Sequence, residues 1–143
     1  MQADKRRKTQ VALEYAWRRA GDPACSVFWV HTDSETTFAQ DYKLIAKKLG
    51  VGNGLDGEEL LAAVRERIET YTNWVLVLDN TDNLTLFGVG RTPSAEEPSS
   101  LYDFVPRGTT GTVLWTSRDE RIAGSLVTAR RAMLTRRAVV AGP

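Results

Sequence analysis

Two short runs of residues constrain the fold more than any other feature: the first is continuously apolar up to Asp79, and the second has a similar character with an apolar centre. They are "WVLVLDN" at 74–80 and "TVLWTSR" at 112–118. A half-exposed strand alternates apolar with polar residues, whereas a strand covered on both faces is apolar throughout. Such covered strands occur mainly in parallel sheets that lie between layers of helices. Both runs therefore predict inner strands of an α/β fold.

Three segments with helical spacing accompany these strands. Apolar residues three and four apart predict a helix that begins at about Thr9. A second helix is predicted between a capping serine, Ser34, and a terminating glycine, Gly50, and a third over 56–71. Between the first two helices, "SVFWVHT" at 26–32 predicts a further strand. Strands and helices in this order indicate an α/β domain.

Composition limits the classes of partner. The 143 residues carry 19 basic and 18 acidic side chains, so no global field attracts the chain to nucleic acid or to an anionic membrane. No apolar run reaches the roughly 18 residues that cross a bilayer. One cysteine excludes a cysteine-based zinc cage, and one histidine argues against a histidine metal site. His31 is interpreted as a polar strand end rather than a catalytic base. We expect a cytoplasmic protein that binds neither nucleic acid nor membrane.

Polar residues end the two apolar strands, Asp79 the first and Arg118 the second. In an open α/β sheet, ligands bind at the carboxyl ends of the strands. A carboxylate there can bind Mg²⁺, which prefers oxygen ligands, and an arginine can contact a terminal phosphate. Asp79 can equally cap the turn at 80–83, and Arg118 can be solvated or pair with a neighbour such as Asp119.

Lys8 and Thr9 lie at the predicted start of the first helix, where the helix dipole is positive. A lysine in this position can bind phosphate oxygens, and a hydroxyl can bind Mg²⁺. A Lys-Thr pair has almost no specificity by itself. Its combination with Asp79 and Arg118 at two strand ends is more specific and indicates a phosphate site.

Four segments resemble, in order and spacing, the NB-ARC nucleotide-binding domain of STAND P-loop ATPases, especially fungal NLR-like proteins that carry tetratricopeptide repeats. They are "KTQVALEYA", "VFWVHTDSETTFAQDYKLIAKKLG", "WVLVLDNTDN" and "GTVLWTSRDERIAGSLV". The resemblance implies an incomplete P-loop NTPase, a three-layer α/β/α sandwich with a parallel sheet whose first strand is missing. In the family's strand order, 5-1-4-3-2, that strand would lie beside the fourth.

The resemblance also divides the chain. Residues 1–131 would be a partial NB-ARC domain, and 132–143 a tail that can hold a displaced fifth strand. Proline, serine and glutamate dominate 91–100, so we expect this segment to be an exposed flexible insertion.

By the same resemblance, Lys8 and Thr9 look like the end of a Walker A loop. Lys8 and Thr9 would contact phosphate, and Thr9 would also bind Mg²⁺. Asp79 resembles the Walker B carboxylate that binds Mg²⁺, and Arg118 the sensor arginine that contacts phosphate. No acid follows Asp79 directly, so Asp82 would orient the attacking water only if the turn bends back.

The implied function is an ADP/ATP-binding regulatory switch with Mg²⁺ in NLR-like signalling, at most a slow ATPase, with other NB-ARC or NLR chains as partners. Walker A glycines are absent, because Gln2 and Arg7 stand in their places. Side chains there block the loop conformations that wrap a phosphate. We therefore expect weakened or lost nucleotide binding. The alternative is a non-catalytic fragment that docks onto full-length relatives through an open sheet edge at 112–118.

Overall fold

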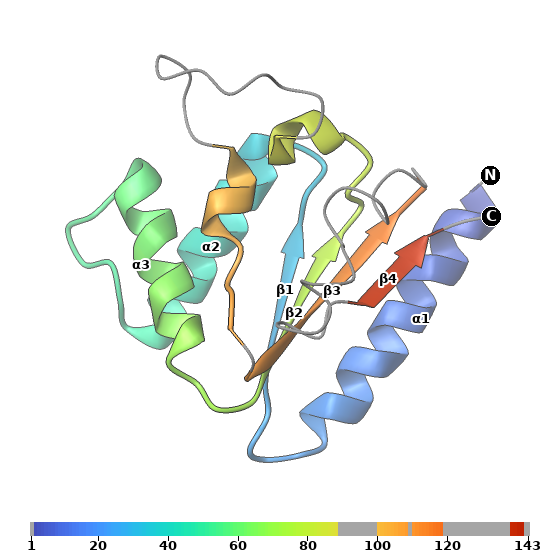
Figure 1. Ribbon diagram of the computed structural model, residues 1–143, viewed down its shortest axis with the longest axis horizontal. Helices are drawn as coiled ribbons and strands as arrows, with labels where there is room; N and C mark the ends of the chain where they lie inside the picture. Colours follow the sequence, from blue (N-terminus) through green and yellow to red (C-terminus); the bar gives the residue numbers. More distant parts are fainter. Residues whose placement is uncertain (1, 89–99, 109, 119–137, 142–143) are drawn as a thin grey trace.

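A parallel sheet forms the centre of the molecule (Figure 1). The computed structural model describes residues 2–88, 100–108, 110–118 and 138–141, with side chains for 10–88, 100–108 and 110–118. Four strands lie side by side in the order β1-β2-β3-β4, and every neighbouring pair is parallel. The strands are β1 (Ser26–His31), β2 (Trp74–Asp79), β3 (Gly111–Ser117) and β4 (Ala138–Ala141).

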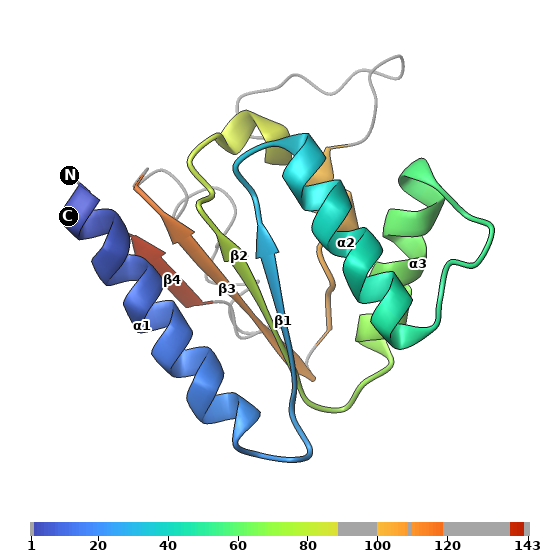
Figure 2. The ribbon, with the colours of Figure 1, turned by 180° about the vertical axis from the view of Figure 1, so that it is seen from behind.

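Helices cover both faces of this sheet (Figures 1 and 2). α1 (Gln2–Ala20) lies on one face, and α2 (Glu35–Leu49) and α3 (Gly57–Glu69) lie on the other. The short 3₁₀ helices η1 (Leu84–Phe87) and η2 (Leu101–Phe104) add to the core on the side of α2 and α3. The predicted three-layer α/β/α sandwich with a parallel sheet is thus confirmed. No helix in the described ranges is long and apolar enough to cross a lipid bilayer.

Strand β2 separates two hydrophobic cores, which explains its uninterrupted apolar sequence. Trp74, Leu76 and Leu78 belong to the core beneath α2 and α3. Val75 and Val77 belong to the smaller core beneath α1. All six residues of β2 are buried, as the parallel-sheet interpretation requires.

The bounds of α2 confirm the capping signals in the sequence. Ser34 is the N-cap: its hydroxyl accepts a hydrogen bond from the Thr37 amide at 3.2 Å, and the Thr37 hydroxyl accepts one from the Ser34 amide at 3.1 Å. Gly50 ends the helix in the left-handed conformation, with φ of 70°. Glycine adopts this conformation without the steric cost that a side chain imposes.

The predicted start of the first helix at Thr9 is wrong, because α1 begins at Gln2. Residues 2–8 carry no apolar stripe, so periodicity could not reveal this part of the helix. They do include alanine, lysines and arginines, which favour helix, and no glycine or proline interrupts the sequence before Gly21. Lys8 and Thr9 therefore lie in the second turn of a continuous helix.

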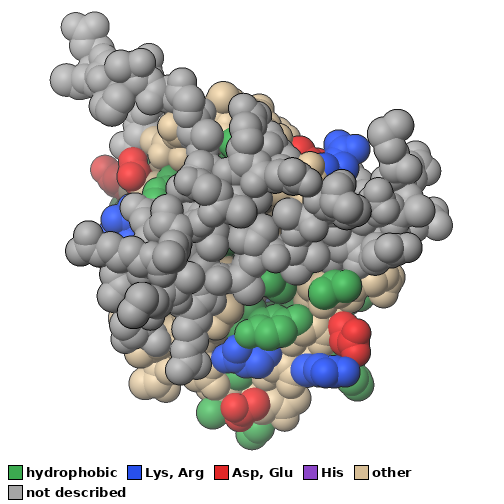
Figure 3. Space-filling view, turned by 45° about the vertical axis from the view of Figure 1, so that its right-hand side comes forward, with side chains coloured by type: hydrophobic (Ala, Val, Ile, Leu, Met, Phe, Trp, Pro, Cys, Tyr) green, Lys and Arg blue, Asp and Glu red, His purple; other side chains and the backbone are tan. Residues whose placement is uncertain are grey.

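The outer side of α1 is partly apolar. Val11 and Leu13 are each 49% exposed, and Trp17 is 78% exposed. Green hydrophobic side chains lie among charged ones on the surface that Figure 3 turns forward, the side of the molecule on which α1 lies. α1 thus contacts the sheet through its small residues Ala12 and Ala16 and leaves larger apolar groups in solvent.

The expected open edge at 112–118 is wrong over most of its length. β4 pairs with β3 from Leu114 to Ser117, opposite Ala138 to Ala141. The C-terminal tail therefore does contain a strand, and that strand lies directly beside β3. Most of the predicted insertion at 91–100 lies outside the described residues, as does 119–131.

Tyr42 joins α2 to the segment after η2. Its side chain is buried, and its hydroxyl donates a hydrogen bond to the Phe104 carbonyl at 2.6 Å. Burial raises the pKa of the Tyr42 phenol far above its usual range; the nearby Arg65 lowers the pKa slightly and Glu69 raises it. The folded protein therefore holds Tyr42 neutral at alkaline pH.

Stability should fall as the pH rises above about 10, the pKa of an unfolded tyrosine. Below that pH, Tyr42 makes its full contribution to stability. As the pH rises from there toward the pKa of the folded state, this contribution is lost, because Tyr42 ionises only in the unfolded state. Tyr42→Phe should lower the unfolding free energy at neutral pH by about 1–2 kcal/mol and make the alkaline decline shallower. Urea denaturation across pH tests this, with Tyr71→Phe as the control. An equal decline in both variants would contradict the assignment to Tyr42.

Candidate functional site

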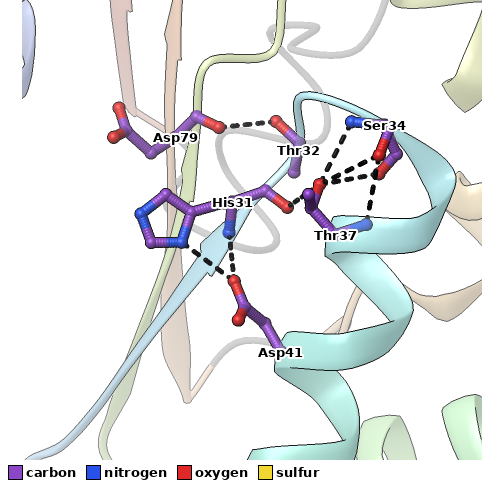
Figure 4. A network of polar contacts seen from close by, with 6 residues as sticks. All are labelled: His31, Thr32, Ser34, Thr37, Asp41 and Asp79. Carbon is purple, nitrogen blue, oxygen red and sulfur yellow. Dashed lines mark hydrogen bonds and ion pairs between the residues drawn. The ribbon is translucent and has the colours of Figure 1, made fainter.

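Asp79 ends β2 at the carboxyl edge of the sheet and is 4% exposed. Its side chain points toward β3, where Oδ1 accepts a hydrogen bond from the Thr116 hydroxyl. Its backbone carbonyl accepts a hydrogen bond from the Thr32 hydroxyl at 2.8 Å (Figure 4) and another from the Thr32 amide at 2.9 Å. Asp79 is thereby fixed from the strands on both sides.

Thr116 on β3 holds the turn that follows Asp79. Its hydroxyl accepts a hydrogen bond from the Asn80 amide at 2.9 Å and donates to Asp79. Its carbonyl accepts from the Thr81 amide at 2.8 Å. Asn80 has φ of 64°, a left-handed conformation that asparagine tolerates better than most residues. These contacts bend the chain after β2 toward β3.

Two further threonine hydroxyls are buried beside this turn. The hydroxyls of Thr32 and Thr81 lie 2.9 Å apart, and that of Thr81 donates to the Leu78 carbonyl at 3.1 Å. Sequence reasoning missed Thr32, Thr81 and Thr116. The signal was present, because a threonine lies at or just past the end of each predicted strand, in "VHT", "DNT" and "LWTS".

The bend brings Asp82 to Arg118, the first residue after β3. Asp82 accepts hydrogen bonds from the Arg118 amide at 2.8 Å and from its Nε at 3.2 Å. The side chains are 30% and 52% exposed, so the pair lies at the surface. Arg118 thus pairs with Asp82, whereas the neighbour considered from the sequence, Asp119, lies outside the described residues. The turn after Asp79 does bend back and brings Asp82 to the same edge of the sheet as Arg118.

The structure gathers Asp79, Asp82 and Arg118 at one edge of the sheet. Lys8 and Thr9 come from α1, which begins near the carboxyl ends of the strands and runs antiparallel to them (Figure 1). Their side chains are not described. Helical amides beyond the first turn bond to carbonyls four residues earlier, so the backbone at Lys8 and Thr9 offers no free amides to a phosphate.

A second polar network joins α2 to the end of β1 (Figure 4). Asp41 accepts hydrogen bonds from the His31 amide at 2.8 Å and lies 2.9 Å from its Nδ1. The Thr37 hydroxyl donates to the His31 carbonyl at 3.1 Å. His31 is the last residue of β1, and its ring is exposed, in agreement with a polar strand end.

Within the described ranges, no group of three His, Cys, Asp or Glu side chains lies close enough together to hold a metal ion without other ligands. Mg²⁺ at nucleotide sites is commonly bound by one or two carboxylates together with substrate phosphates and water. A single carboxylate such as Asp79 fits that second pattern.

Comparison with known proteins gives one informative similarity. No family model and no solved structure matches the chain. The chain is 29% identical over 122 residues to a "Nucleotide-binding leucine-rich repeat (NLR)-like protein" of Hyaloscypha variabilis. The alignment covers 81% of this chain but only 12% of that protein, so the chain spans a small part of its relative. The similarity agrees with the NLR-like resemblance.

Thr116→Val should lower the unfolding free energy by about 1–3 kcal/mol, because it leaves the buried Asp79 carboxylate and the Asn80 amide without this partner. Thr112→Val is a matched control: Thr112 is also buried on β3, and its hydroxyl has no partner within the described residues. That variant should be nearly neutral. Urea denaturation and hydrogen exchange at Asn80 measure the difference, and equal losses in both variants would show that the Thr116 contacts contribute nothing.

Proposed function

We propose that this chain is the nucleotide-binding part of an NLR-like ADP/ATP switch protein, with Asp79 as its magnesium carboxylate. The position of Asp79 carries the proposal: it ends a strand buried on both faces, at the sheet edge where ligands of open α/β folds bind. The similar protein is named as nucleotide-binding, which also supports the proposal.

Thr116 supports a magnesium role for Asp79 because it orients the carboxylate. The hydrogen bond from the Thr116 hydroxyl to Oδ1 restricts rotation of the carboxylate. Outer contacts of this kind commonly tune metal ligands. Asp79 would bind Mg²⁺ directly or through water, and the phosphates of ADP or ATP would complete the coordination.

Arg118 would contact the terminal phosphate. Among the described residues, its amide and Nε bond to Asp82, and the two terminal nitrogens of the guanidinium have no protein partner. These nitrogens could form the bidentate contact that arginine makes with phosphate. Asp82 would then hold Arg118 in place, in addition to the role of orienting water that the sequence suggested.

Lys8 and Thr9 would contribute weakly. Their backbone amides would become available to a phosphate only if the first turns of α1 unwind to form a loop. Unwinding breaks helical hydrogen bonds, and Gln2 and Arg7 lack the freedom of glycine. We therefore propose weak binding of Mg²⁺ with ADP or ATP, and at most slow hydrolysis.

The continuous helix through Lys8 and Thr9 favours a second candidate, a non-catalytic fragment that binds other NLR-like chains. The docking edge expected at 112–118 pairs with β4 over Leu114–Ser117, so it is not available there. This candidate therefore needs another surface of the molecule.

Titration of the full chain with fluorescent ADP and Mg²⁺ tests the first candidate. We expect weak saturable binding that chelation of Mg²⁺ reduces. Asp79→Asn should weaken it about tenfold, equivalent to about 1.4 kcal/mol, and Lys8→Ala should weaken it by less. Asp56→Asn and Lys48→Ala are controls, since Asp56 precedes α3 without a capping bond and Lys48 lies in the last turn of α2.

The outcomes separate the two candidates. A folded wild type with no saturable binding rules out a nucleotide site in this chain and leaves the interaction role. Binding that Asp79→Asn and Asp56→Asn reduce equally would contradict the assignment of Asp79 as the magnesium ligand.

A further inference from the structure

β1 has an outer edge that the described sheet does not use. β1 pairs only with β2 within the described residues, and Figure 2 shows it as the front strand, between α1 and α2. The amides of Ser26 and Thr32 bond inward, to Asn73 and Asp79. Successive residues of a strand direct their backbone groups to opposite sides. The backbone groups of Val27, Trp29 and His31 therefore point outward.

α2 closes one of these three outward positions. Asp41 binds the His31 amide, and Thr37 binds the His31 carbonyl (Figure 4). The next outward residue below Val27 is Cys25, whose amide bonds to the Asp22 carbonyl at 2.9 Å. Val27 and Trp29 remain, and their outward amides and carbonyls have no partner in the described part of the chain.

We propose that β1 of a second copy of this chain pairs antiparallel with this edge, around a twofold axis at Phe28. Val27 then lies opposite Trp29 of the other copy, and Trp29 opposite Val27. Outward residues that face one another in an antiparallel ladder exchange two hydrogen bonds, so the two pairs form four.

The neighbouring contacts fix this register. An axis at Trp29 would need the outward groups of His31, which Asp41 and Thr37 already bind. An axis at Val27 would need the amide of Cys25, which already binds Asp22. An axis at Phe28 needs neither. The free backbone groups are therefore self-complementary in one register, which favours a second copy over an unrelated strand.

The side chains around the edge agree with self-pairing. Aromatic residues opposite β-branched ones, as in the Trp29 and Val27 pair, are favourable cross-strand neighbours. On α2, Leu44 and Lys48 follow Asp41 on the same helical stripe, and Leu44 is 60% exposed. The twofold axis runs the two α2 helices antiparallel on one face of the combined sheet.

The interface is small, because only two residues on each strand supply hydrogen bonds. Stable complexes usually bury about 1,200 Å² or more, so we expect a weak dimer that forms at high concentration. This pairing does not involve Asp79, Arg118 or Lys8, and it is independent of nucleotide binding.

Sedimentation of the full chain over a wide range of concentration tests the proposal. The wild-type mass should rise from 15.9 kDa toward twice that value. Val27→Pro and Trp29→Lys should stay at 15.9 kDa. Proline removes an amide that bonds to nothing in the described chain, as edge strands tolerate, and lysine discourages pairing between edges. Leu55→Lys, which changes an exposed apolar residue in the loop before α3, should dimerise like the wild type.

A wild type that remains monomeric at every concentration overturns the proposal, and so does dimerisation that persists in the folded Trp29→Lys variant. If Val27→Pro fails to fold, hydrogen exchange in the wild type supplies the second measurement. Protection of the Val27 and Trp29 amides should increase with protein concentration. Exchange at these two amides that does not change with concentration overturns the pairing of β1.

Discussion

The burial of β2 on both faces is the constraint on which the other elements depend. Its alternate residues belong to different cores, so helices must cover both sides of the sheet. The same packing requires glycine at the first position of β3, because a Cβ at Gly111 would lie 1.9 Å from Cε2 of Trp74. Because both faces of β2 are covered, its one polar residue, Asp79, lies at the end of the strand, at the carboxyl edge of the sheet.

Much of the fold follows from local sequence rules, and the exceptions have physical causes. The apolar strands, the caps of α2 and the parallel arrangement were predictable, because burial and backbone geometry select residue types directly. The start of α1 was not, because residues 2–8 form helix through intrinsic propensity without an apolar stripe. The place of β4 was not predictable either, since four small apolar residues do not specify which strand they join.

The candidate site was predictable in position but not in its contacts. Strand ends identified Asp79 and Arg118, because ligands and polar residues gather at that edge in this fold class. The partners of these residues depend on a turn with Asn80 in the left-handed conformation. That turn directs Asp82 to Arg118 and lets Thr116 bind both Asp79 and the Asn80 amide. Sequence spacing contains no information about such a bend until the neighbouring strand is placed.

Helix α1 and a phosphate-binding loop make opposite demands on the same residues. A helix satisfies its amides internally and favours alanine, lysine and arginine, whereas a phosphate loop leaves its amides free and requires glycine. Residues 2–20 contain no glycine, and they form one helix. The edge around Asp79 needs no such rearrangement, because strand packing and threonine hydroxyls already hold it. A phosphate loop in this segment would therefore require α1 to unwind, whereas the sheet edge at Asp79 would keep its present geometry.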